Sequence, residues 1–91
     1  MTAQIIHKPE THHFEARIDG RAGFIAYRVG DGVMTLLHTE VDPALEGHGV
    51  AADLVRAALD HARANGLKID PACSYAASYM ERHPETMSLR A

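Results

Sequence analysis

Alternating apolar and polar positions mark the first half of the chain as β-strands. The run from His13 to Ile18 alternates with the period of two that a half-buried strand shows. Further strands are predicted over 4–8, 22–29 and 33–41, and the last of these is the most hydrophobic. Asp19-Gly20 and Gly30-Asp31-Gly32 supply the residues that tight hairpin turns need. The first half is therefore predicted to be an antiparallel meander.

The spacing of apolar residues changes to a helical period after Gly49. Between Gly49 and Asn65 they recur every three or four positions, at Ala51, Leu54, Val55, Ala58, Leu59 and Ala62. Gly66 suits the left-handed residue that follows a helix. A short strand over 67–70, stopped by Pro71, and a second helix over 74–83, ended by Pro84, complete the predicted order. A strand–helix–strand crossover requires a parallel neighbour, so we expect a mixed, mainly antiparallel sheet with one long and one short helix.

Length and composition narrow the class of protein. The 91 residues are predicted to form a single α/β domain over 1–91. A net charge of −3 with only 9 Lys and Arg leaves no basic field for nucleic acid. No apolar run approaches the ~18 residues of a membrane span, and the lone Cys73 cannot form an internal disulfide. We expect a cytoplasmic protein, a monomer or weak dimer. None of the seven histidines has metal-ligand spacing, so no metal site is predicted.

The segment Leu45 to Ala52 lies between the most hydrophobic strand and the long helix. It holds two glycines just before the first helical turn, where unpartnered N–H groups and the helix dipole favour a phosphate. A Walker-type loop is excluded, because Val50, Ala51 and Ala52 follow Gly49 where that loop needs Lys and Ser or Thr. Gly47-x-Gly49-x-x-Ala52 fits a dinucleotide fingerprint, but that domain needs repeated βαβ units. Dinucleotide binding therefore stays a weaker alternative.

The same segment resembles the pyrophosphate loop of the GNAT superfamily of N-acetyltransferases, which reads Arg/Gln-x-x-Gly-x-Gly/Ala before a helix. Gly49 and Ala51 keep the pattern, and Glu46 departs from it by replacing Arg or Gln. Nearly the whole chain is similar to the small, single-domain GNAT-like proteins. The stretches that carry this similarity are 38–41, 45–51, 66–69, 71–75 with its Cys73-Ser74-Tyr75 motif, and His83-Pro84.

The resemblance implies a minimal GNAT fold that binds acetyl-CoA or coenzyme A. Backbone N–H groups of the loop would hold the pyrophosphate, and the residues concerned are Gly47, His48, Gly49, Val50, Ala51 and Ala52. The side chains of Glu46 and His48 would face outward. The backbone of Val41, at the end of its strand, would pair with the pantetheine arm and help hold the thioester carbonyl.

Acetyl transfer to an amine needs a base for the ammonium proton and an acid for the departing thiolate. Glu40 is a candidate base, and His38, on the same strand face by the period of two, could relay its proton. Each could equally be an ordinary solvated side chain. Tyr75 and Tyr79 share a helix face, and the resemblance implies that one hydroxyl protonates the thiolate. Tyr79 is also expected at the cofactor, with aromatic packing on the sheet as the alternative.

Cys73 stands at the start of the predicted second helix, where the dipole favours a thiolate. It could form an acetyl-enzyme or act as a general acid or base. It could also line the site as a small buried hydrophobe. Direct transfer, the usual GNAT route, favours the lining role.

These features predict an acetyl-CoA-dependent N-acetyltransferase acting on a primary amine. The chain lacks the two N-terminal helices that build the acceptor site in larger relatives. An open acceptor cleft would suit an exposed protein lysine or a polyamine better than an enclosed small amine. A non-catalytic module that binds coenzyme A or a protein partner is the alternative from another class.

Overall fold

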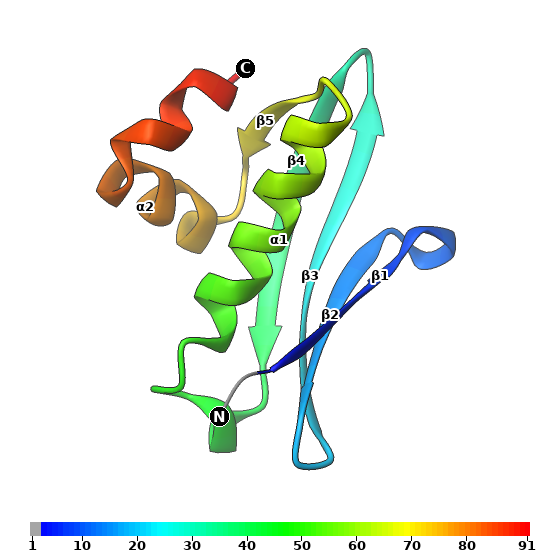
Figure 1. Ribbon diagram of the computed structural model, residues 1–91, viewed down its shortest axis with the longest axis vertical. Helices are drawn as coiled ribbons and strands as arrows, with labels where there is room; N and C mark the ends of the chain where they lie inside the picture. The colour runs from blue at the N-terminus through cyan, green and yellow to red at the C-terminus, as the bar shows by residue number, and fades with distance from the viewer. Residues whose placement is uncertain (1–2) are drawn as a thin grey trace.

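The computed structural model describes residues 3–91 and forms one five-stranded sheet in the order β1-β2-β3-β4-β5 (Figure 1). The strands are β1 (Gln4–Lys8), β2 (His13–Ile18), β3 (Arg21–Gly30), β4 (Val33–Val41) and β5 (Lys68–Pro71). The first four are antiparallel, and β5 runs parallel to β4. The predicted meander and the single crossover are confirmed. The predicted end at Pro71 is off by one residue, because Pro71 is the last residue of β5 and pairs with Leu36.

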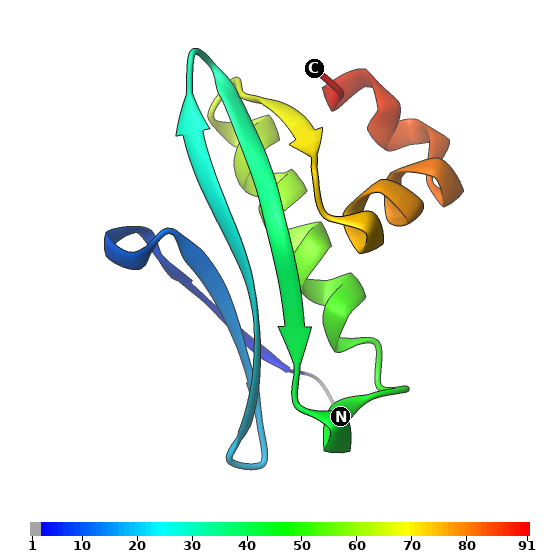
Figure 2. The ribbon, with the colours of Figure 1, turned by 180° about the vertical axis from the view of Figure 1, so that it is seen from behind.

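Two α-helices pack on this sheet, α1 (Val50–Ala64) and α2 (Ser74–Arg82). Three short 3-10 helices were not predicted: η1 (Pro9–Thr11), η2 (Pro43–Leu45) and η3 (Pro84–Leu89). Helix α1 lies across one face of the sheet, and α2 with η3 flanks β5. Seen from behind, the opposite face of β2, β3 and β4 has no helix of residues 3–91 over it (Figure 2).

The two long hairpins close with the turns that the sequence predicts. Asp19 and Gly20 have φ of 49° and 75°, and Asp31 and Gly32 have φ of 54° and 76°. Two successive positive φ values define the type I′ turn, whose twist matches that of the flanking strands. Only one pair of strands in residues 3–91 is parallel, so the sheet is not the largely parallel one on which dinucleotide domains are built.

A β-bulge in β4 changes which side chains face α1. Ala26 pairs with His38, whereas the next residue of β3, Tyr27, pairs with Leu36, which leaves Leu37 as the extra residue. Leu36 and Thr39 therefore share the helix-covered face although they are three positions apart. His38 and Glu40 lie on the uncovered face.

The core lies between α1 and the sheet. Its largest fully buried side chains come from three strands and both α-helices: Ile25, Met34, Leu36, Leu54, Val55, Ile69 and Met80. The predicted positions Leu54, Val55, Ala58, Leu59 and Ala62 are buried, whereas Ala51 is only half-buried. Each large side chain contributes about 1.5–3 kcal/mol by leaving water, so this stripe holds α1 against the strands. No helix among residues 3–91 is long and apolar enough to cross a membrane.

Candidate functional site

Strands β4 and β5 separate after four paired residues. Their parallel pairing joins Val33–Leu36 to Lys68–Pro71, and the N–H of Cys73 then donates to the carbonyl oxygen of Leu36 at 2.8 Å. Beyond that bond, residues 37–41 of β4 have no strand on their β5 side within the described chain. Within the described residues, a strand edge without a partner strand therefore runs down β4 from Leu37 to Val41.

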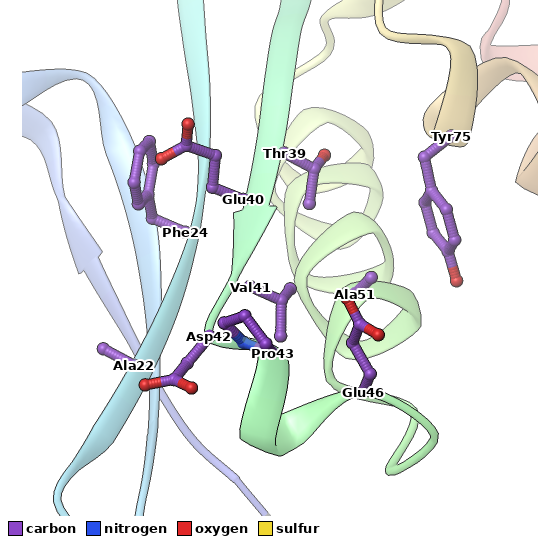
Figure 3. Close-up of a pocket in the computed structure, with 10 residues that line it drawn as sticks. All are labelled: Ala22, Phe24, Thr39, Glu40, Val41, Asp42, Pro43, Glu46, Ala51 and Tyr75. Atoms are coloured by element: carbon purple, nitrogen blue, oxygen red, sulfur yellow. The ribbon is translucent and has the colours of Figure 1, made fainter.

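A cavity of about 780 Å³ lies beside this free edge (Figure 3). It is lined by Ala22, Phe24, Thr39, Glu40, Val41, Asp42, Pro43, Glu46, Ala51 and Tyr75. A second cavity of about 320 Å³ adjoins it and is lined by Val41, Leu45, Glu46, Gly47, Gly49, Val50, Ala51 and Tyr75. Four residues line both, so the two cavities adjoin, and together they extend from β3 to the start of α1.

The start of α1 presents free amide groups to the second cavity. Gly49 is the N-cap residue with φ of 74°, and the first helical bond runs from the N–H of Asp53 to its carbonyl oxygen at 3.0 Å. The amides of Val50, Ala51 and Ala52 come before that bond and donate to no other group among residues 3–91. Those three N–H groups and the positive end of the helix dipole suit a phosphate.

The predicted loop residues separate into two groups. Gly47, Gly49, Val50 and Ala51 line the second cavity. His48 is exposed and lines neither cavity, and its N–H donates to the carbonyl oxygen of Leu45 at 3.2 Å. The side chain of Ala52 packs against the core, so only its amide is available. Val41 is placed as predicted, at the end of β4 where both cavities meet.

Glu46 is exposed, as expected for a side chain that faces outward, but it also borders the cavities. Its side chain lines both cavities, and Figure 3 shows its carboxylate turned toward Ala51. The turn that positions it follows η2, whose N-cap residue Asp42 accepts the N–H of Ala44 at 2.9 Å. A negative charge therefore stands beside the amides that suit a phosphate.

Cys73 is the N-cap residue of α2 and is 8% exposed. Its Sγ lies 3.4 Å from Oγ1 of Thr39, which lines the larger cavity. Burial raises the pKa of the Cys73 thiol, but hydrogen bonds from Thr39 and from the N–H groups of Ala76 and Tyr75 outweigh it and lower the pKa. The thiol therefore adjoins the cavity through Thr39.

Glu40 and His38 lie on the uncovered face of the sheet. Glu40 pairs across the strands with Phe24, and both line the larger cavity. His38 does not line it, but its Nε2 lies 3.9 Å from Oε1 of Glu40. The two side chains are 57% and 68% exposed, so this pair stands in water.

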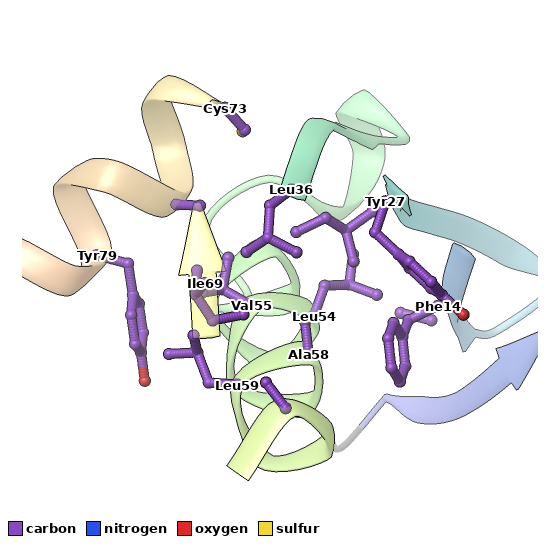
Figure 4. Close-up of a cluster of buried hydrophobic side chains, with 14 of the residues drawn as sticks. Phe14, Tyr27, Leu36, Leu54, Val55, Ala58, Leu59, Ile69, Cys73 and Tyr79 are labelled. Carbon is purple, nitrogen blue, oxygen red and sulfur yellow. The ribbon is translucent and has the colours of Figure 1, made fainter. Parts of the chain in front are cut away.

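The two tyrosines of α2 lie in different places. Tyr75 lines both cavities, whereas Tyr79 is 5% exposed and lines a separate hollow with Arg56 and His83. Its ring stacks on that of His83 with centroids 4.0 Å apart. Figure 4 shows it beside Leu59 and Ile69 in the core cluster. Tyr79 is thus not brought to the hollow where a cofactor role was expected.

Several cavity residues were not anticipated from the sequence, among them Thr39 and Phe24. In the sequence, Thr39 and Phe24 look like ordinary strand residues. The bulge that turns Thr39 toward Cys73 cannot be predicted from the alternation of apolar and polar residues. The described residues contain no group of three or more His, Cys, Asp or Glu side chains that could hold a metal ion.

Comparisons with known proteins agree with this geometry. The family described as GCN5-related N-acetyl-transferase matches residues 13–89. Protein NATD1 of Gallus gallus is 34% identical over 84 residues, which cover 89% of this chain and 76% of that protein. Protein NATD1 of Mus musculus is 33% identical over the same shares of the two chains.

A solved structure has the same fold. The solution NMR structure of a GCN5-like protein from Staphylococcus aureus matches with a TM-score of 0.75 and 29% sequence identity. The match covers 97% of this chain and 87% of that one. The family match, the relatives and the shared fold together show that the chain belongs to the GCN5-related N-acetyltransferase family.

Proposed function

We propose that the protein binds acetyl-CoA and transfers the acetyl group to a primary amine. One observation carries this proposal: the edge of β4 without a partner strand and the free first-turn amides of α1 lie at two adjoining cavities. A strand edge offers the hydrogen bonds that the amides of a pantetheine arm require. The helix start offers those that a pyrophosphate requires.

The space at the helix start fits a diphosphate. Gly47 and Gly49 have φ of 84° and 74°, and no heavy atom outside their chain neighbours lies within 4 Å of where a Cβ would stand. The backbone is therefore open to close approach on that side. The Glu46 carboxylate opposes this fit, since it adds a like charge next to the phosphates.

Acetyl-CoA supplies an activated acetyl thioester, and the chain supplies the groups that orient it and move protons. Val41 is proposed to hold the thioester carbonyl through its backbone. Glu40 takes a proton from the incoming ammonium, and His38, 3.9 Å away, passes it to water. The freed amine nitrogen then attacks the carbonyl carbon, so that a C–N bond forms and the C–S bond breaks. The nitrogen, now bonded to the acetyl carbon, loses its second proton to solvent, while Tyr75 donates its hydroxyl proton to the departing thiolate and regains one from solvent.

Cys73 is proposed to line the site without forming a covalent bond to the acetyl group. Its thiol is nearly buried and already hydrogen-bonded to Thr39. An acetyl-enzyme is the competing role, and Cys73→Ala and Cys73→Ser distinguish the two. Turnover retained in both variants supports lining. Loss of turnover in both with coenzyme A binding intact would establish chemistry at Sγ.

Calorimetry against coenzyme A, NAD and ATP tests the binding step. We expect binding of coenzyme A and not of the two nucleotides. Acetyl-CoA mixed with a panel of lysine peptides, polyamines and small amines should then release free thiol. Tight binding with no thiol release across the panel would instead favour a non-catalytic module, an alternative that the exposure of Glu40 supports.

A further inference from the structure

We propose that Phe24 and Glu40 form the subsite for the acceptor, and that the acceptor is a lysine side chain presented on another protein or peptide. This inference rests on the proposed acetyltransferase function. It assigns Phe24 to the acceptor subsite and specifies a lysine side chain as the amine.

Phe24 and Glu40 stand directly opposite each other on β3 and β4. Figure 3 shows the Glu40 carboxylate beside the ring of Phe24, and both residues line the cavity of about 780 Å³. The ring is held in place by neighbours on either side, with centroid distances of 5.8 Å to His13 and 5.5 Å to His38. An aromatic ring and a carboxylate therefore lie side by side in the wall of the cavity.

The cavity reaches both faces of the sheet around the free edge of β4. Thr39, Val41 and Tyr75 belong to its helix-covered side, whereas Phe24 and Glu40 belong to the uncovered side. A thioester held along the edge of β4 would thus meet a nucleophile that comes across Phe24. The two substrates would not compete for the same entrance.

The chemistry of this wall favours an alkylammonium group. The four methylenes of a lysine would lie against the ring of Phe24, and the ammonium would pair with Glu40. The charged residues that line the cavity are Glu40, Asp42 and Glu46, and no Lys or Arg lines it. Asp42 is already paired with Arg21 at 3.5 Å, so Glu40 is the carboxylate on the acceptor side without a cationic partner among Lys and Arg of residues 3–91.

The open surroundings favour a lysine on a large molecule. Sites for small molecules typically bury about 70–90% of the ligand. On the acceptor side only the sheet would contact the ligand, because no helix of residues 3–91 covers that face. Leu37, the bulge residue of β4, lies outside the cavity and is 41% exposed. Residues that flank the acceptor lysine would gain contacts there that a free amine could not make.

The test uses the full chain, acetyl-CoA and three acceptors: a lysine-containing peptide, a capped single lysine and spermidine. We expect kcat/KM for the peptide to exceed that of both small amines by roughly tenfold. Phe24→Ala should lower kcat/KM for the peptide by roughly tenfold and leave the Kd for coenzyme A unchanged. Phe24→Leu, which keeps bulk without the ring, should give a smaller loss of kcat/KM. The matched control is Val29→Ala on the same strand, an exposed apolar side chain outside the cavity.

Three different outcomes would contradict the macromolecular acceptor, the Phe24 subsite and the acetyltransferase function. Equal or better use of spermidine or the single lysine would overturn the choice of a macromolecular acceptor. Wild-type kcat/KM for the peptide in both Phe24 variants would overturn the subsite. Both results leave the acetyltransferase function standing, whereas failure of the unmodified chain to bind coenzyme A would overturn that function together with this inference.

Discussion

Oγ1 of Thr39 lies 3.4 Å from Sγ of Cys73, and this contact joins the bulged strand β4 to the start of α2. The hydroxyl faces the larger cavity, and the thiol lies behind it. The contact connects the most reactive side chain of the site to the space proposed for the thioester.

Removing the Thr39 hydroxyl should raise the pKa of the Cys73 thiol. Burial raises that pKa, and the hydrogen bond from Thr39 is the first of the opposing causes that lower it. We expect Thr39→Val to shift the midpoint of thiolate formation to higher pH, measured by ultraviolet absorbance and by the pH dependence of alkylation. Thr39→Ser keeps the hydroxyl and should retain the unmodified midpoint. The same midpoint in all three proteins would show that Thr39 does not act on the thiol.

The free energy of unfolding should decrease as the pH falls from neutral to mildly acidic values, because of His7. Nε2 of His7 lies 2.6 Å from the hydroxyl oxygen of Tyr27, and its ring stacks on Phe14 at 4.2 Å. Burial, followed by the nearby charge of His61, lowers the pKa of His7 below 6.5. The unfolded chain then binds a proton more readily than the folded one. The stabilising contribution is therefore complete above about pH 6.5 and is lost as the pH falls through that value toward the folded pKa.

Chemical denaturation at a series of pH values between about 5 and 7.5 measures this effect. His7→Gln keeps a hydrogen-bonding group and removes the titration, so its unfolding free energy should depend less on pH. His48→Gln, in the exposed loop, is the control and should follow the unmodified protein. A slope unaltered in His7→Gln would contradict the assignment.

Gly49→Ala should cost stability through backbone conformation alone. A Cβ at this position meets no atom within 4 Å, but φ is 74°, a region that disfavours side chains by about 1–2 kcal/mol. Gly30→Ala is a matched control, since Gly30 also has open space and lacks a positive φ. Urea unfolding should separate the two variants, with the Gly30 variant within about 0.5 kcal/mol of the unmodified protein. Equal stability of the two variants would show that the left-handed N-cap is not strained by a side chain.

Neutralising Glu46 should tighten binding of coenzyme A. The carboxylate lines both cavities beside the amides of the helix start, where it repels a diphosphate. We expect Glu46→Gln to lower the Kd by roughly threefold at low salt, and the gain to shrink as salt screens the charge. Calorimetry at two salt concentrations measures it. Glu81→Gln, an exposed change on α2 outside the two cavities, should have no effect. Weaker binding by the Glu46 variant would mean that the carboxylate helps to hold the ligand.

The strands and helices could be read from the sequence because each has its own period and its own end signals. Val33–Val41 alternates or runs apolar up to Asp42, and the stripe of α1 ends at a glycine with φ of 68°. The parallel pairing of β4 and β5 followed from the crossover. The order of the elements thus needed no tertiary information.

The positions of the site side chains were harder to predict from the sequence, because their directions depend on the β4 bulge and on loop geometry. A bulge shifts the face of every later residue, so Thr39 reaches Cys73 only in three dimensions. Glu46 borders both cavities because of where the turn after η2 places it, which no local sequence pattern predicts. Tyr75 and Tyr79 lie on the same helix. Tyr79, however, stacks on His83 and lines a separate cavity with Arg56.

The larger cavity has walls from β3, from the β4–η2 segment, and from the first residues of α1 and α2. These segments come together only when the crossover through α1 has placed β5 beside β4. A chain in which this crossover has not formed therefore lacks the cavity. Anything that fills the cavity would therefore bind the finished protein alone and shift the folding equilibrium toward it. The free energy of unfolding should therefore rise with the concentration of such a ligand.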